Sequence, residues 1–161
     1  MSELCVFCDE WSRGDNTFAE TELRRARWDL YPVTPGHVER TPKRHVQYIE
    51  QLSDEEDATL LRFARWVMQT IRETDLEQLY RTMLEAADDT NRSLQQGALA
   101  SLALRAGEPN AFNFGLNDGP EAGQSVPHFH LHLMPRWQGD MKNPRGGVRN
   151  IFPNDSYKEL R

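Results

Sequence analysis

The sequence has little cysteine: Cys5 and Cys8 are the only two in 161 residues. A pair three positions apart does not make the disulfide framework of a small secreted domain. No stretch approaches the roughly 18 consecutive apolar residues that a membrane helix needs. Residues 1–4 also lack the basic segment and apolar run of a signal peptide. We therefore expect a cytoplasmic protein that makes no contact with a membrane.

Positive charge is also in deficit: the sequence has 19 Lys and Arg residues against 25 Asp and Glu residues, which gives a net charge of −6. General nucleic-acid binding requires a basic face, so this balance argues against a nucleic-acid partner. A small anionic ligand stays possible, since its binding depends on the local pocket. The mean hydropathy of −0.74 predicts solvent-rich helices or loops. The length predicts a single domain over residues 1–161.

The order of the predicted elements indicates an α+β fold. Strands are expected in residues 17–28 and 37–41, a helical block in 53–106, and further strands in 111–116 and 128–134. Ser53 followed by Glu56 is a capping box that begins the helical block. The apolar stripes of this block fit core packing, with a partner-binding helix as the alternative. Strands, then helices, then strands predict a mostly antiparallel sheet.

Three of the five histidines, His128, His130 and His132, alternate with apolar residues. On a strand all three imidazoles would emerge on one face, with Phe129 and Leu133 on the other. Two kinds of site fit this row: a metal centre, or nucleophilic and acid chemistry on an anionic substrate. The upstream Gly-Gln-Ser at 123–125 offers donors for an oxyanion, which favours the second kind without excluding the first.

The segment from Asn117 to Arg136 resembles the signature of the histidine triad (HIT) superfamily, in which three histidines alternate with apolar residues. The resemblance extends to Pro35-Gly36-His37 and Pro42-Lys43-Arg44-His45, and to Asp29 eight residues before His37. It covers about residues 3–45 and 111–152. It implies a HIT-like fold of one domain, in which an insertion extends the helical block of 53–106.

The same resemblance implies a nucleotide hydrolase or transferase that acts at the α-phosphate through a covalent nucleotidyl-histidine. By position His130 is the nucleophile, His132 contacts the phosphoryl oxygens or leaving group, and His37 supports the triad. The implied catalytic residues are His37, His128, His130 and His132. The implied substrate-binding residues are Asp29 and Asn117 at the ribose end, and Gln124 and Ser125 beside the phosphate.

Many bacterial members of this superfamily carry Cys-x-x-Cys and bind a structural zinc ion. The resemblance therefore implies that Cys5, Cys8, His45 and His128 form a closed site for Zn²⁺. The alternative is a pair of reduced cysteines without metal. The proposed chemistry itself requires no catalytic metal.

Several substrates are compatible with the motif. Residues 120–126 and Pro135-Arg136 resemble the fragile-histidine-triad branch, which favours dinucleoside polyphosphates. A Hint-like nucleoside phosphoramidase and a nucleotide phosphorylase are alternatives, and a non-enzymatic, zinc-stabilised nucleotide-binding module is a further one. The implied partners are a purine nucleotide or dinucleotide and a second copy of the chain in a homodimer.

Two features depart from the family pattern. Glu39 and Arg40 place charges on a strand that is expected to be internal, so either that strand is exposed or the charges are paired. The helical block is also longer than a compact HIT domain needs, and residues 75–106 are expected to cover the site or to form a dimer interface.

Overall fold

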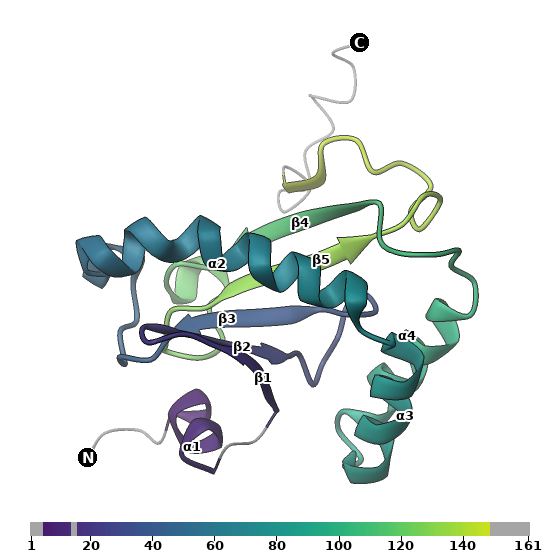
Figure 1. The fold of residues 1–161 in the computed structure, drawn as a ribbon, viewed down its shortest axis with the longest axis horizontal. Helices are drawn as coiled ribbons and strands as arrows, with labels where there is room; N and C mark the ends of the chain where they lie inside the picture. Colours follow the sequence, from purple (N-terminus) through teal and green to yellow (C-terminus); the bar gives the residue numbers. More distant parts are fainter. Residues whose placement is uncertain (1–4, 14–15, 149–161) are drawn as a thin grey trace.

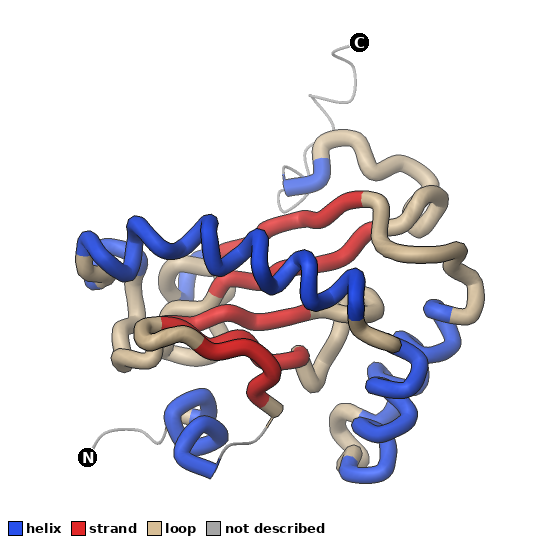
Figure 2. The backbone as a smooth tube through the Cα atoms, viewed as in Figure 1, coloured by secondary structure: helices blue, strands red, loops and turns tan. Residues whose placement is uncertain are grey.

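A computed structural model describes residues 5–13 and 16–148. Five strands form one sheet in the order β1-β2-β3-β5-β4, and all four pairings are antiparallel (Figures 1 and 2). The strands are β1 (Thr17–Glu20), β2 (Arg24–Trp28), β3 (Val38–Pro42), β4 (Ala111–Leu116) and β5 (Leu131–Arg136). The helices are α1 (Val6–Arg13), α2 (Asp54–Glu73), α3 (Leu76–Ala86) and α4 (Arg92–Leu102), with short 3₁₀ turns η1 (Ile49–Gln51) and η2 (Pro120–Ala122). The predicted α+β class is confirmed.

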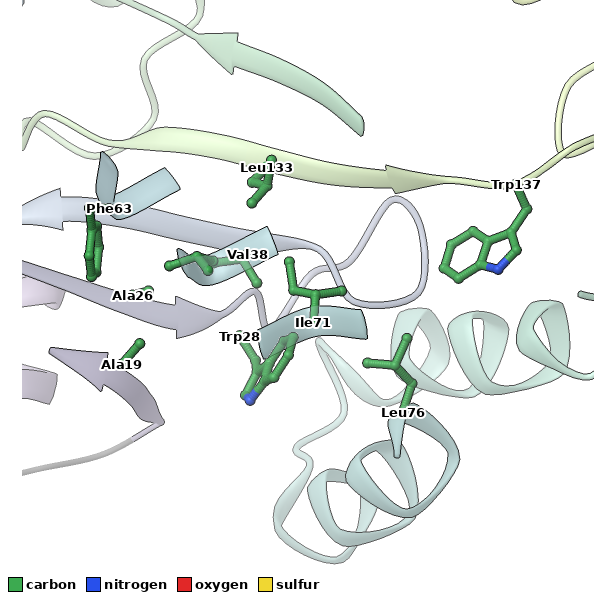
Figure 3. Packing of buried hydrophobic residues seen from close by; sticks show 10 residues of the cluster. Ala19, Ala26, Trp28, Val38, Phe63, Ile71, Leu76, Leu133 and Trp137 are labelled. Atoms are coloured by element: carbon green, nitrogen blue, oxygen red, sulfur yellow. The ribbon is translucent and has the colours of Figure 1, made fainter. Parts of the chain in front are cut away.

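Helix α2 lies across one face of the sheet and closes the main hydrophobic core (Figure 1). The Ser53 hydroxyl accepts from the Glu56 N–H while the Glu56 carboxylate accepts from the Ser53 N–H, so the predicted capping box is present. Phe63, Val67 and Ile71 recur every four residues and form one buried stripe. This stripe packs against sheet residues that include Trp28, Val38 and Leu133 (Figure 3).

Helices α3 and α4 pair with each other beside the sheet, at the end of α2 (Figure 1). They contact the loop of residues 30–36, which joins β2 to β3: the Gly36 N–H donates to the Tyr80 hydroxyl at 2.9 Å. Gly36 has a φ of +73°, and a Cβ there would lie 3.2 Å from Leu76, so glycine suits both the conformation and the contact. The helical block therefore supports the loop that precedes His37.

The strand expected over residues 128–134 begins later, at Leu131. Pro127 has no N–H to give a neighbouring strand, and the Phe129 N–H donates to the Val46 carbonyl instead of joining the ladder. Residues 128–130 are buried without alternation, since His128, Phe129 and His130 are each at most 1% exposed. The expectation that all three histidines share one strand face is therefore wrong, because only His132 belongs to β5.

None of the helices in residues 5–13 and 16–148 combines the length and apolar character needed to cross a membrane.

Candidate active site and metal centre

The second face of the sheet carries His132, with the ring of His130 5.0 Å away, and α1 contacts β2 on this side. Side chains alternate along each strand, so the neighbours of Val38 and Leu133 point away from α2. On that side the register places Arg27 opposite Glu39, and Glu39 opposite His132. Helix α1 contacts the same side, since its Glu10 pairs with Arg27. The sheet therefore separates a core that is apolar apart from two buried arginines, Arg24 and Arg40, from a face that carries histidines and carboxylates.

The predicted metal ligands converge between α1, the start of the β3–α2 connection and the segment before β5. The Cys5 Sγ lies 3.4 Å from the His128 Nδ1, and the Cys8 Sγ lies 3.4 Å from the His45 Nδ1. The Cys8 Sγ is also 3.6 Å from the His128 Nδ1. Around a tetrahedral zinc ion, sulfur and nitrogen ligands lie about 3.5 Å apart. The spacing of these atoms therefore suits a tetrahedral ion.

The surroundings of this cluster favour the ligating form of His128 but, without a metal, disfavour the thiolate of Cys8. The His128 Nε2 lies 3.1 Å from the Pro42 carbonyl, so Nε2–H donates there and Nδ1 keeps its lone pair toward the thiols. Burial lowers the pKa of His128 to about 4, which keeps the ring neutral. Burial, followed by the neighbouring Cys5 thiol, raises the pKa of Cys8 to about 11. A divalent cation would offset this effect, because it stabilises thiolates.

His130 is almost completely enclosed, at 1% exposed. Its Nδ1 lies 2.8 Å from the His128 carbonyl, which can only accept, so Nδ1 carries the hydrogen and Nε2 carries the lone pair. The Phe7 ring stands edge-on to the imidazole, with centroids 5.3 Å apart. Burial lowers the pKa of His130, so its lone pair is available at neutral pH.

A chain of hydrogen bonds leads from Asp29 to His132. The Asp29 Oδ2 lies 2.8 Å from the His37 Nδ1, and the His37 Nε2 lies 3.1 Å from the His132 Nδ1. Asp29 is 6% exposed, and its other carboxylate oxygen accepts from the Tyr31 N–H. Burial and then the charges of His37 and His130 lower the pKa of His132 to about 4. The same three side chains, Asp29, His37 and His132, are also close enough together to hold a metal ion.

The predicted residues of the 117–125 loop do not join this cluster. Among the described residues, no hydrogen bond connects Asn117, Gln124 or Ser125 to a triad histidine. The Gln124 amide instead donates to the Gln47 carbonyl at 2.9 Å, and the Asn117 amide reaches the Gly123 carbonyl at 3.5 Å. The Ser125 side chain is exposed. Their assignment to substrate binding stays a prediction.

Three residues beside the histidines were not predicted from the sequence as site residues: Phe7, Glu10 and Arg27. Phe7 also approaches His128, and Arg27 lies under the same helix. Glu39, noticed in the sequence only as a charge on an internal strand, contacts Arg27 at 3.2 Å. The strand is buried, and Glu39 is paired with Arg27, whereas Arg40 lies over the Phe114 ring at 5.4 Å and forms no ion pair within the described part of the chain. An unexpected charge on a core strand is a usable sequence signal, but it does not identify its partner.

Comparisons with known proteins agree with this architecture. A family model described as the HIT domain matches residues 13–139. A protein of Mycobacterium tuberculosis named AP-4-A phosphorylase is 31% identical over 123 residues, which is 76% of this chain and 47% of the relative. A Schizosaccharomyces pombe protein named bis(5'-nucleosyl)-tetraphosphatase (asymmetrical) is 30% identical over 135 residues, or 84% of this chain and 57% of the relative. The chain thus spans about half the length of these curated relatives.

A solved structure described as a zinc-bound histidine triad family protein from Mycobacterium smegmatis superimposes with a TM-score of 0.61 at 25% identity. The match covers 87% of this chain and 80% of that one. The family model spans β1 to β5 and includes all three triad histidines. On this evidence the chain belongs to the HIT family.

Proposed function

We propose that the chain is a nucleotide hydrolase or transferase that acts on dinucleoside polyphosphates at the α-phosphate, with His130 as the nucleophile. Support for the substrate class comes from the relatives, which are named as a diadenosine tetraphosphate phosphorylase and a dinucleoside tetraphosphatase. The observation that carries the proposal is the tautomer of His130. Because Nδ1–H is held by the His128 carbonyl, Nε2 has a free lone pair with which to attack phosphorus.

The reaction then divides into two displacements. In the first, the His130 Nε2 bonds to the α-phosphorus while the P–O bond to the remaining phosphate chain breaks, so that the leaving group departs with that electron pair. In the second, water attacks the same phosphorus, the P–N bond breaks, and His130 is regenerated with the release of a nucleoside monophosphate. If inorganic phosphate replaces water, a nucleoside diphosphate is released instead.

The Asp29–His37–His132 chain prepares the groups beside the phosphate. Asp29 accepts from the His37 Nδ1–H, so the His37 Nε2 accepts from the His132 Nδ1–H. The His132 Nε2 is then left to face the phosphoryl group. A bound polyphosphate raises the pKa of His132, which favours the protonated ring that donates to the phosphoryl oxygens or to the leaving group. Asp29 thus orients His37, in addition to the ribose contact that the family resemblance implies.

Cys5, Cys8, His45 and His128 are the residues that would hold a structural Zn²⁺. Their donor set is the closed two-cysteine, two-histidine type, and their spacing suits a tetrahedral ion. When bound, zinc supplies a cross-link between α1 and the sheet and no step of the reaction. His128 would then serve the structural site through its ring and the nucleophile through its carbonyl.

The substrate is tested with purified protein on diadenosine triphosphate, diadenosine tetraphosphate and an adenosine phosphoramidate, each with and without inorganic phosphate. We expect turnover of a dinucleoside polyphosphate. A phosphate-dependent rate with a nucleoside diphosphate product would identify a phosphorylase. Turnover confined to the phosphoramidate would identify a Hint-like enzyme and contradict the proposed substrate.

The nucleophile is tested by rapid mixing with substrate, alkaline quenching and mass spectrometry of the peptide that contains His130. We expect a nucleotidyl adduct on that peptide in the unsubstituted protein and none in His130→Ala. An adduct on another residue, or equal turnover by His130→Ala, would show that the covalent route is wrong.

A further inference from the structure

A buried cluster of ionisable groups lies directly beside the triad. Arg27, Glu10 and Glu39 are 4%, 8% and 8% exposed. The Arg27 guanidinium pairs with Glu10 through Nη1, and its Nε lies 3.2 Å from the Glu39 Oε2. The three residues come from β2, α1 and β3, so the cluster joins one helix to two neighbouring strands.

Burying such groups is expensive, and apolar residues of similar volume often stabilise a fold as well or better. The other face of these two strands carries Ala26, Trp28 and Val38 together with the buried arginines Arg24 and Arg40, and no carboxylate. The cluster therefore calls for a role beyond closing the core, and its neighbours indicate that role.

Arg27 contacts α1 at the point where α1 meets the expected nucleophile. Its guanidinium carbon lies 5.1 Å from the centre of the Phe7 ring. The Phe7 ring in turn makes edge-to-face contacts with two imidazoles. Its centroid lies 5.3 Å from that of His130 and 5.9 Å from that of His128. The rotation of His130 about its side chain is thus limited on one side by the His128 carbonyl and on another by Phe7.

We propose that Arg27, held between Glu10 and Glu39, is a positioning residue for the nucleotidyl-transfer reaction: it seats α1 on the sheet so that Phe7 keeps His130 in its attacking orientation. The role rests on the proposed function, because it names the group that aims the nucleophile. Arg27 itself touches neither of the expected substrate-facing atoms, the His130 Nε2 and the His132 Nε2, in any described contact.

The test compares Arg27→Met with Arg24→Met. Methionine keeps an apolar stem and removes the charge and the donors. Arg24 is a matched control on the same strand, because it is 1% exposed but lies on the other face, where it reaches the Glu56 carbonyl and the Thr59 hydroxyl of α2. For each protein, kcat and KM are measured on a dinucleoside polyphosphate, along with the melting temperature and amide hydrogen exchange in residues 5–13.

We expect Arg27→Met to lower kcat by about 10- to 100-fold while KM changes by less than about twofold, because a nucleophile displaced by an ångström loses rate rather than binding. Exchange in α1 should become faster in this variant only. Arg24→Met should lower the melting temperature at least as much as Arg27→Met does, and its kcat should equal that of the unsubstituted protein.

A kcat retained by Arg27→Met would overturn the positioning role. So would equal kcat losses in the two variants, since both would then reflect general destabilisation. A failure of the proposed function looks different, because the unsubstituted protein would then turn over none of the substrates, and the positioning role would fail with it.

Discussion

The two faces of the sheet are built from the same strands but follow opposite rules. On β3, Val38 joins the apolar core under α2, whereas the next residue, Glu39, joins a charged cluster under α1. On β5, Leu133 and His132 divide in the same way. The α2 face is stabilised by contact area, which tolerates changes of similar volume. The α1 face depends on hydrogen-bond partners and the states of protonation of its groups.

The difference separates stability from chemistry. Every group for which a reaction step is proposed lies on or beside the α1 face, and the large aliphatic side chains of the core lie on the α2 face. Substitutions on the two faces should therefore affect different measurements. The predictions below test this separation.

The largest effects are expected from a pair of substitutions, His130→Ala and Leu133→Ala. Removal of the nucleophile should lower kcat at least about 1,000-fold, because the covalent route is lost. Loss of the Leu133 side chain should leave a cavity and cost about 3 kcal/mol of unfolding free energy. At temperatures well below its melting temperature, Leu133→Ala should have the same kcat as the unsubstituted protein. Urea unfolding and steady-state kinetics measure both quantities.

If His130→Ala and Leu133→Ala lost kcat and unfolding free energy to the same extent, the division between the two faces would be contradicted. Phe129→Leu is a useful additional control, since it changes a fully buried side chain next to the nucleophile while preserving its apolar character.

The next effect concerns the metal. Elemental analysis should find about one zinc ion per chain, given four converging ligands. Removal with a chelator should lower the melting temperature by about 5 °C or more, because α1 loses a cross-link to the sheet. Cys8→Ser should reproduce the change and no longer respond to the chelator. A metal-free protein with an unaltered melting temperature after chelation would contradict the structural role.

The smallest effect concerns the pH dependence of stability. Burial raises the pKa of Glu39 from 4.5 to about 8. Between these values the folded chain holds a proton that the unfolded chain has released, so stability falls as the pH rises through this window. Glu39→Gln cannot titrate and should escape this loss. Its melting temperature relative to the unsubstituted protein should therefore increase by a few degrees between about pH 5.5 and pH 8.5.

The pKa of His132 is lowered from 6.5 to about 4, and its effect on stability runs in the opposite direction with pH. Stability is lost as the pH falls below 6.5, because the unfolded chain then binds a proton that the folded chain does not. That contribution is present in both proteins and cancels in the difference. Glu20→Gln, an exposed substitution, serves as the control, and an identical pH profile for Glu39→Gln and the unsubstituted protein would contradict the assignment.

Much of the fold could be predicted from local patterns. The capping box at Ser53 and Glu56, the apolar period of the helical block and the strand over residues 111–116 all appear in the structure. Each depends on neighbours a few residues away, and so each is readable in a short stretch of sequence. The start of β5 was not predicted correctly, because the Phe129 N–H finds its partner at Val46, far away in the chain.

By itself the sequence determined the order of the elements from residue 17 onward, the mostly antiparallel fold class and the triad motif, since all three depend on the spacing of residue types within continuous segments. It did not predict α1. Only the tertiary structure decided that His128 faces Cys5, that Asp29 supports His37 and that Arg27 joins Glu10 to Glu39. The physical reason is that these contacts depend on strand register and on how α1 docks against the sheet. Both are set by packing across the whole domain.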